Sequence, residues 1–149
     1  MTNISLLSQP RSVAVAAIYQ DGKYLMQLRD DIPGIFYPGV WGLFGGQIET
    51  GEEPKAAVKR ELVEEINYYA DRLSEFRCYA DDKIIRHVFS CPLSVSLEQL
   101  ELYEGYDLAL LSPAEIERGY GYSPKAKLEK AIGDIHRQMM LDFIATQTA

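Results

Sequence analysis

The segment from Gly46 to Tyr68 constrains the fold of this chain more than any other. The glycine pair Gly45-Gly46 lies at its start, and Pro54 fits the first turn of a helix, where its missing N–H needs no partner. Apolar side chains then recur every fourth residue and form one stripe, at Val58, Leu62 and Ile66. We therefore expect a helix from Pro54 to about Ile66 with one face packed on a core. Asn67 should end it, because asparagine tolerates the left-handed conformation.

Acidic side chains gather on one side of this helix. A helix turns by about 100° per residue, so Glu61, Glu64 and Glu65 can reach one point from one face. Like charges this close repel one another, so a positive group is expected among them. Carboxylate oxygens suit a hard divalent cation, Mg²⁺ or Mn²⁺, and the carbonyl of Gly45 is a further candidate ligand. The alternative is a solvated acidic face, which is common on surface helices.

Arg60 and Glu52 suggest a structural support for this cluster. Arg60 projects from another side of the helix, and Glu52 lies in the turn before it. A charge-assisted pair between them would tie the turn to the helix.

The rest of the chain predicts alternating strands and helices. A turn signal at residues 20–22 separates two apolar runs, which predicts a hairpin of residues 12–19 and 23–29. Ser112-Pro113 predicts a short helix, and Ser123-Pro124 repeats that signal and predicts a final helix to about residue 145. Further strands are expected at residues 42–48, 76–80, 84–95 and 106–111. We expect one mixed α/β domain over residues 1–149.

Composition narrows the possible partners. The chain has a formal net charge of −7 and a pI of about 4.8. Polymeric nucleic acid is bound through Lys and Arg, so an acidic chain is a poor candidate for it. A small phosphorylated substrate remains compatible, because a bound metal reverses the local field.

Cysteine use and hydropathy favour a cytoplasmic protein. Cys78 and Cys91 lie far apart in apolar, strand-like runs, so we expect two buried, reduced thiols. The first residues lack the pattern of a secretion signal, and no segment reaches the ~18 apolar residues of a membrane span. Neither a membrane partner nor a zinc site is indicated.

The spacing of charged residues resembles the Nudix box. Its positions are Gly46, Glu52, Arg60-Glu61-Leu62, Glu64-Glu65 and Asn67-Tyr68, without a gap. Two positions depart from the family pattern: Asn67 stands where glycine is usual, and Tyr68 stands where an aliphatic residue is usual. All charged positions of the motif, residues 46–68, are present. The chain is thus identified as a MutT-like member of the Nudix hydrolase family, without a subfamily.

This resemblance implies an α/β/α sandwich with a mixed sheet and the hydrolysis of a diphosphate linkage in a nucleoside diphosphate-type substrate. It makes Glu61, Glu64, Glu65 and the Gly45 carbonyl the ligands of Mg²⁺, which Mn²⁺ could replace. Glu52 and Arg60 become the supporting pair, and Glu61, Glu64 or a residue of a distant loop the general base. Homodimers are frequent in the family. The alternative is a catalytically inactive nucleotide-binding or regulatory module of the same fold.

Substrate contacts are expected outside the motif. Arg29 could bind a phosphate or could form a surface ion pair with Asp30 or Asp31. Aromatic residues near the site could stack on a base or could pack in the core, namely Phe36, Tyr37, Trp41 and Phe44. Phe44 stands where many family members carry proline, so a nucleoside triphosphate, an oxidised nucleotide and a nucleotide sugar all stay open as substrates. We expect His87 to be structural and His136 to lie on the surface or in the core.

Overall fold

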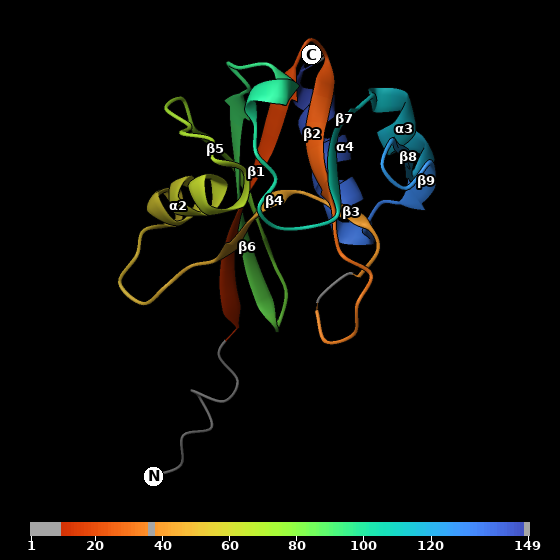
Figure 1. Cartoon of the computed structure of the whole chain (residues 1–149). Helices are drawn as coiled ribbons and strands as arrows, with labels where there is room; N and C mark the ends of the chain where they lie inside the picture. Colours follow the sequence, from red (N-terminus) through yellow and green to blue (C-terminus); the bar gives the residue numbers. More distant parts are fainter. Residues whose placement is uncertain (1–9, 36–37, 148–149) are drawn as a thin grey trace.

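The computed structural model describes residues 10–35 and 38–147, which form a seven-stranded mixed sheet with helices on both sides and a separate two-stranded sheet of β8 and β9 (Figure 1). The elements, in chain order, are β1 (Arg11–Gln20), β2 (Lys23–Leu28), β3 (Trp41–Gly42), β4 (Phe44–Gln47), α2 (Pro54–Ile66), β5 (Ser74–Ala80), β6 (Ile84–Pro92), the 3₁₀ helix η1 (Leu97–Gln99), β7 (Asp107–Leu111), α3 (Pro113–Arg118), β8 (Tyr120–Ser123), β9 (Leu128–Ala131) and α4 (Asp134–Gln147).

Strand β1 is the centre of the sheet. It runs parallel to β6 on one edge and antiparallel to both β4 and β2 on the other. Its first half pairs with β4, from Val13 to Ala16, and its second half pairs with β2, from Ile18 to Gln20. The sheet therefore splits along this edge into a branch with β4 and a branch with β2, β3 and β7.

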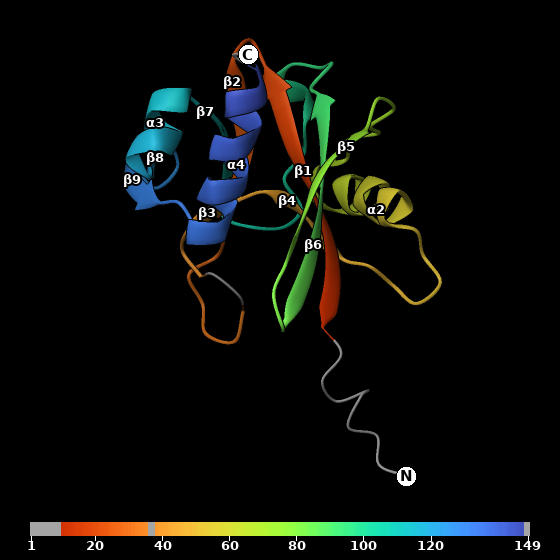
Figure 2. The same cartoon turned by 180° about the vertical axis from the view of Figure 1, so that it is seen from behind.

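The two faces of β1 supply two hydrophobic cores. Ala14, Ala16 and Ile18 pack with the apolar stripe of α2, whereas Val15 and Ala17 pack on the side of α4. Alternate residues of a strand point to opposite faces, so one apolar run serves both cores. Figure 2 shows α2 on one side of the sheet and α4 on the other. The predicted α/β/α sandwich is confirmed.

Helix α2 begins and ends as its sequence predicts. It runs from Pro54 to Ile66, and Asn67 adopts the left-handed conformation with φ 55°. The N–H of Tyr68 donates to the carbonyl of Leu62, which completes a Schellman motif. Tyr68 is buried and its hydroxyl donates to the carbonyl of Pro92 at 3.0 Å. Tyr68 is therefore accommodated in place of an aliphatic residue, because its buried hydroxyl has a hydrogen-bond partner.

The predicted start of the last helix at Ser123-Pro124 is wrong. Ser123 ends β8, its hydroxyl accepts the N–H of Ala126, and a turn with Lys127 at φ 59° leads into β9. Helix α4 begins only at Asp134. A serine followed by proline is also typical of turns, and here the pair lies in the turn of the hairpin formed by β8 and β9.

The expectation of two buried thiols holds for Cys91 alone. Cys91 is buried on β6, and Cys78 is exposed on β5 at the edge of the sheet. Both are free thiols. In the part of the chain that the structure describes, no helix is long and apolar enough to cross a membrane.

We expect Leu62→Ala to lower the free energy of unfolding by about 3 kcal/mol, because the fully buried side chain joins α2 to the sheet. Urea denaturation measures the change. Lys59→Ala is the matched control, since this exposed residue of the same helix should change stability by less than about 0.5 kcal/mol. Equal effects of the two substitutions would contradict the packing described.

Candidate active site

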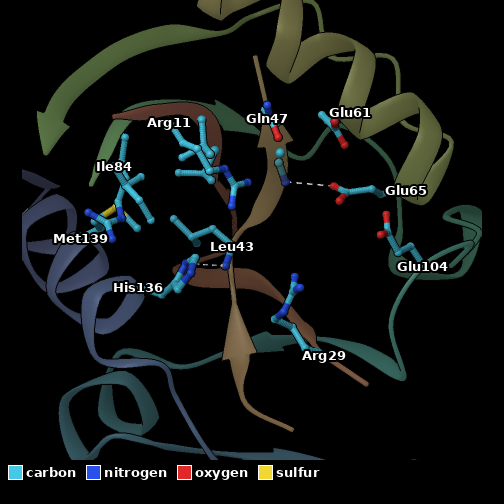
Figure 3. A pocket seen from close by; sticks show the side chains of 15 residues that line it. Arg11, Arg29, Leu43, Gln47, Glu61, Glu65, Ile84, Glu104, His136 and Met139 are labelled. Atoms are coloured by element: carbon cyan, nitrogen blue, oxygen red, sulfur yellow. Dashed lines mark hydrogen bonds between the residues drawn. The ribbon is translucent and has the colours of Figure 1, made fainter. Parts of the chain in front are cut away.

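A cavity of about 300 Å³ lies on the sheet where α2, α4 and several loops meet (Figure 3). Glu61, Glu65 and Glu104 line one side of it and form what we name the acidic wall. Arg11, Arg86 and His136 line it as well and form what we name the basic wall; Figure 3 shows Arg11 and His136 opposite the carboxylates. Carboxyl groups therefore face guanidinium and imidazole groups across one cavity.

The glycine pair of β4 lets α2 approach the strand closely. Gly45 has φ 143°, and a Cβ there would lie 2.1 Å from the carbonyl oxygen of Ala14. A Cβ on Gly46 would lie 2.6 Å from the carboxyl carbon of Glu61. Neither position accepts a side chain without displacing its neighbours, so the Glu61 carboxylate rests against bare backbone.

Glu65 is the most buried acid of the site. Its Oε1 accepts the N–H of Gly45 at 2.9 Å, and the residue is 4% exposed. Burial raises the pKa of Glu65 to about 9, and the charges of Glu61 and Glu104 add to this effect. Burial also raises the pKa of Glu61. The acidic wall therefore favours either a bound proton or a bound cation.

The predicted contact between Arg60 and Glu52 is present. Arg60 Nε donates to Glu52 Oε2 at 2.8 Å and its Nη2 donates to Glu52 Oε1 at 3.0 Å. The same guanidinium donates to Glu61 Oε1 at 3.0 Å and to the carbonyl of Gln47 at 3.1 Å. The hydrogen bond from Arg60 lowers the pKa of Glu52 to about 2. Arg60 thus joins the turn, the end of β4 and the acidic wall.

Glu64 does not share the cavity with the other two glutamates of the helix. Its side chain is 57% exposed and lies 3.4 Å from Arg60 at the outer surface. Glu104, from the loop before β7, takes the third place in the acidic wall. Among the described residues, no three His, Cys, Asp or Glu side chains are already arranged to hold a metal ion.

Glu104 was missed from the sequence because its loop is distant from the motif. Tyr103 N–H donates to the carbonyl of Glu65 at 2.8 Å, and the buried amide of Gln27 donates to the carbonyl of Glu104 at 2.8 Å. These bonds fix the loop beside the end of α2. The sequence does contain one indication of this loop, an acidic residue followed by Gly105. In the structure Gly105 has a φ of 98° and forms the turn before β7.

The donor chemistry of the acidic wall fits a hard divalent cation. Glu61, Glu65 and Glu104 offer carboxylate oxygens, which Mg²⁺ and Mn²⁺ prefer, and the glycine backbone leaves room beside Glu61. Burial raises the pKa of Glu65, and it raises the pKa of Glu61 although Arg60 donates to that carboxylate, so a cation would stabilise the charged form of both groups.

His136 lies in the cavity, whereas the sequence placed it on the surface or in the core. Its Nδ1 accepts the N–H of Leu43 at 3.1 Å, so the proton of the neutral ring is on Nε2. Burial lowers the pKa of His136 to about 4, and the charges of Arg29 and Arg86 act in the same direction. Arg29 also lines the cavity, as a phosphate-binding residue must.

Of the two alternatives for Trp41 and Phe44, stacking on a base or packing in the core, the structure shows packing in the core. Both rings are fully buried, so neither presents a face to a ligand. The indole N–H of Trp41 donates to the carbonyl of Gly121 at 2.9 Å, and Phe44 packs in the core under α2. Phe36 and Tyr37 lie outside the described residues.

Comparison with known families agrees with this fold and motif. The family described as the NUDIX domain matches residues 8–132. The chain belongs to the Nudix family.

The chain is also similar to curated relatives over part of its length and to solved structures in its fold. Nucleoside triphosphatase NudI of Escherichia coli O139:H28 and that of Shigella flexneri are each 41% identical over 56 residues, which is 38% of this chain and 39% of each relative. The chain thus aligns with less than half the length of these relatives. A MutT NUDIX hydrolase from Burkholderia pseudomallei has a TM-score of 0.69 at 22% identity and covers 89% of this chain and 97% of its own. A MutT protein from Methanosarcina mazei Go1 has a TM-score of 0.70 at 20% identity, with 95% and 98% covered. These two structures share the fold.

We expect the stability of the protein to fall below neutral pH through His136. Burial lowers the pKa of the ring from 6.5 in the unfolded chain to about 4 in the folded protein, so its contribution to stability is complete above pH 6.5 and decreases as the pH falls toward 4. From pH 7.5 to 5 the free energy of unfolding should drop by about 2 kcal/mol from this group.

His136→Asn is the control, because Asn keeps an acceptor for the Leu43 N–H and does not titrate. Urea denaturation of both proteins at several pH values gives the difference. A pH dependence that the substitution leaves unchanged would show that His136 is not its source.

Proposed function

We propose that this protein is a Mg²⁺-dependent hydrolase that cleaves a diphosphate linkage in a nucleotide-type substrate. The observation that carries the proposal is the cavity with an acidic and a basic wall, built on the Nudix motif. Carboxylates suit a cation, and guanidinium groups suit phosphate oxygens. A molecule that unites both is a metal-bound phosphate compound.

Residues of α2 and β4 would hold the metal. We assign Glu61, Glu65 and the Gly45 carbonyl as ligands, and Glu64 as a further ligand whose exposed side chain has freedom to turn. When bound, the cation would neutralise the charge that develops on the phosphate oxygens and lower the pKa of the attacking water.

The remaining tasks fall to side chains of this chain. Arg29, which lines the cavity, would bind a phosphate oxygen. The proton of the attacking water passes to a carboxylate oxygen, for which Glu61, Glu64 and Glu104 are the candidates. Arg60 binds Glu52, which holds the turn before α2 in place, and it also binds Glu61, which fixes the position of that carboxylate.

The names of the relatives support one substrate class without excluding the others. A match to proteins named nucleoside triphosphatase favours a nucleoside triphosphate, while an oxidised nucleotide or a nucleotide sugar would use the same metal chemistry. Residues 1–149 acting as one domain, a homodimer and a cytoplasmic location stay predictions from the sequence.

Hydrolysis across a panel of triphosphates, oxidised triphosphates, nucleotide sugars and dinucleotides tests the proposal. We expect Glu61→Gln and Glu65→Gln each to reduce kcat/KM by about 100-fold or more, because each removes a charge that the cation requires. Glu53→Gln is the control, since this exposed residue precedes the same helix and lies outside the cavity.

A panel without any turnover would instead favour a catalytically inactive nucleotide-binding module. Within the series, a variant of a metal ligand weakens Mn²⁺ binding in calorimetry, whereas a variant of Glu104, the candidate base that is not assigned as a ligand, leaves that affinity near the wild-type value.

Arg60→Ala should reduce turnover more than it reduces Mn²⁺ affinity. The substitution frees the turn and the Glu61 carboxylate but removes no metal ligand. Comparing kcat with the Mn²⁺ dissociation constant separates the two effects, and the exposed Arg72→Ala is the control. Full turnover of the Arg60 variant would remove the supporting role from this pair.

A further inference from the structure

Strand β4 lies between the two charged ends of the cavity. Figure 3 shows the acidic wall and Arg29 on one side of this strand, and Arg11, Ile84 and Met139 on the other. A diphosphate held by a metal at the acidic wall would therefore have Arg29 beside it. The far end of the cavity, beyond β4, is then open to another part of the same substrate.

The far end is built on the sheet. Gln47, Val13 and Arg86 occupy paired positions on β4, β1 and β6, so their side chains share one face. Neighbouring strands lie about 4.8 Å apart, which places the backbone of Arg86 roughly 10 Å from that of Gln47. Arg86 is thus set back from the metal site by two strand spacings. An anion that it binds would be a group separate from the diphosphate.

Arg86 brings a positive charge into an almost closed place. Its side chain is 11% exposed, and it donates to Asp81 Oδ2 at 3.3 Å with one nitrogen. Asp81 is 53% exposed, and its other oxygen accepts the N–H groups of Lys83 and Ile84. A guanidinium has five N–H groups, so one long contact with a surface carboxylate leaves Arg86 able to bind a second anion.

The electrostatic field at this end supports the same occupant. His136 lines the cavity from α4, and the charges of Arg29 and Arg86 lower its pKa in addition to burial. Both guanidinium groups therefore act on this part of the cavity. The whole chain has a net charge of −7, so attraction of an anion here would be a local property of the site.

Apolar side chains adjoin the charge. Arg11 lies beside Ile84 in the register of β1 with β6, and Met139 lines the cavity from α4. A phosphate chain has no carbon surface to bury against them, whereas a sugar has one. The arrangement therefore suits an acidic group that is carried on a carbon frame.

From this geometry we infer that the Arg86 end of the cavity is an anion subsite, which binds a second acidic group on a sugar of the substrate, a carboxylate or a phosphate ester. The inference rests on the proposed function and names its substrate class. That class is diphosphate compounds with a further anion, in preference to their neutral counterparts. Arg29 and the metal bind the diphosphate, and Arg86 binds the distant anion.

Two pairs of compounds that differ by one acidic group test the inference. UDP-glucuronate has a carboxylate where UDP-glucose has a hydroxymethyl group, and NADP⁺ has a phosphate ester where NAD⁺ has a hydroxyl group. We expect kcat/KM with Mg²⁺ to be about tenfold or more higher for the acidic member of at least one pair, which is the scale of a charge-assisted hydrogen bond. The pair that shows the preference identifies the acidic group.

Calorimetric titration of the same pairs in EDTA measures the preference without turnover. Tighter binding of an acidic member without hydrolysis of any nucleotide would reject the proposed function and keep the anion subsite. Hydrolysis with equal kcat/KM and equal binding within both pairs would overturn the inference and keep the proposed function.

Variants locate the preference. Arg86→Met keeps an unbranched apolar stem but removes the charge, so it should reduce the ratio toward one, and Arg86→Lys should retain part of the ratio. Asp81→Asn removes the competing charge and keeps an acceptor for the N–H groups of Lys83 and Ile84, so the ratio should rise. Arg77→Met is the matched control, because Arg77 lies on the neighbouring strand β5 outside the cavity and should leave the ratio unchanged.

Two results with variants would also overturn the inference. One is a ratio that survives in Arg86→Met, and the other is a ratio that falls to one in Asp81→Asn. If Arg86→Met does not fold, the wild-type ratios and the surface substitution Asp81→Asn decide.

Discussion

The close approach of α2 to the backbone of β4 is the constraint on which the site depends. Two positions without side chains, Gly45 and Gly46, let the carboxylates of Glu61 and Glu65 rest on a strand instead of in water. Removal from water makes these charges costly, which raises their pKa values and makes a cation the natural partner. Arg60 reaches only the outer side of the cluster, so the inner side still requires positive charge from elsewhere.

Local features of the fold could be predicted from the sequence. Pro54 and Asn67 define the ends of α2, and the hairpin of β1 and β2 follows from its turn signal, because these signals act over a few residues. Ser123-Pro124 failed because the same local signal serves both a helix start and a hairpin turn, and only the pairing of β8 with β9 decides.

In the site too, the residues held together by local structure could be predicted, and those brought together by long-range pairing could not. Glu52, Arg60, Glu61 and Glu65 come together as their spacing indicates, since one helix and its preceding turn hold them all. Arg86, His136 and Glu104 were not foreseen, because only the parallel pairing of β1 with β6 and the return of the chain through α4 bring them near. Trp41 and Phe44 were placed at the site by proximity in sequence, yet the alternation of β3 and β4 turns both rings inward.

The anchoring of the loop before β7 has its own consequence. Gln27 is buried in the middle of the sheet, and its amide holds the carbonyl of Glu104, while Tyr103 is tied to the end of α2. A free loop would lose conformational entropy whenever a ligand ordered it, and that loss would weaken binding. Here the loop is preorganised by the sheet itself, so the affinity of the acidic wall for its ligand is set by charge and fit rather than by the ordering of the chain.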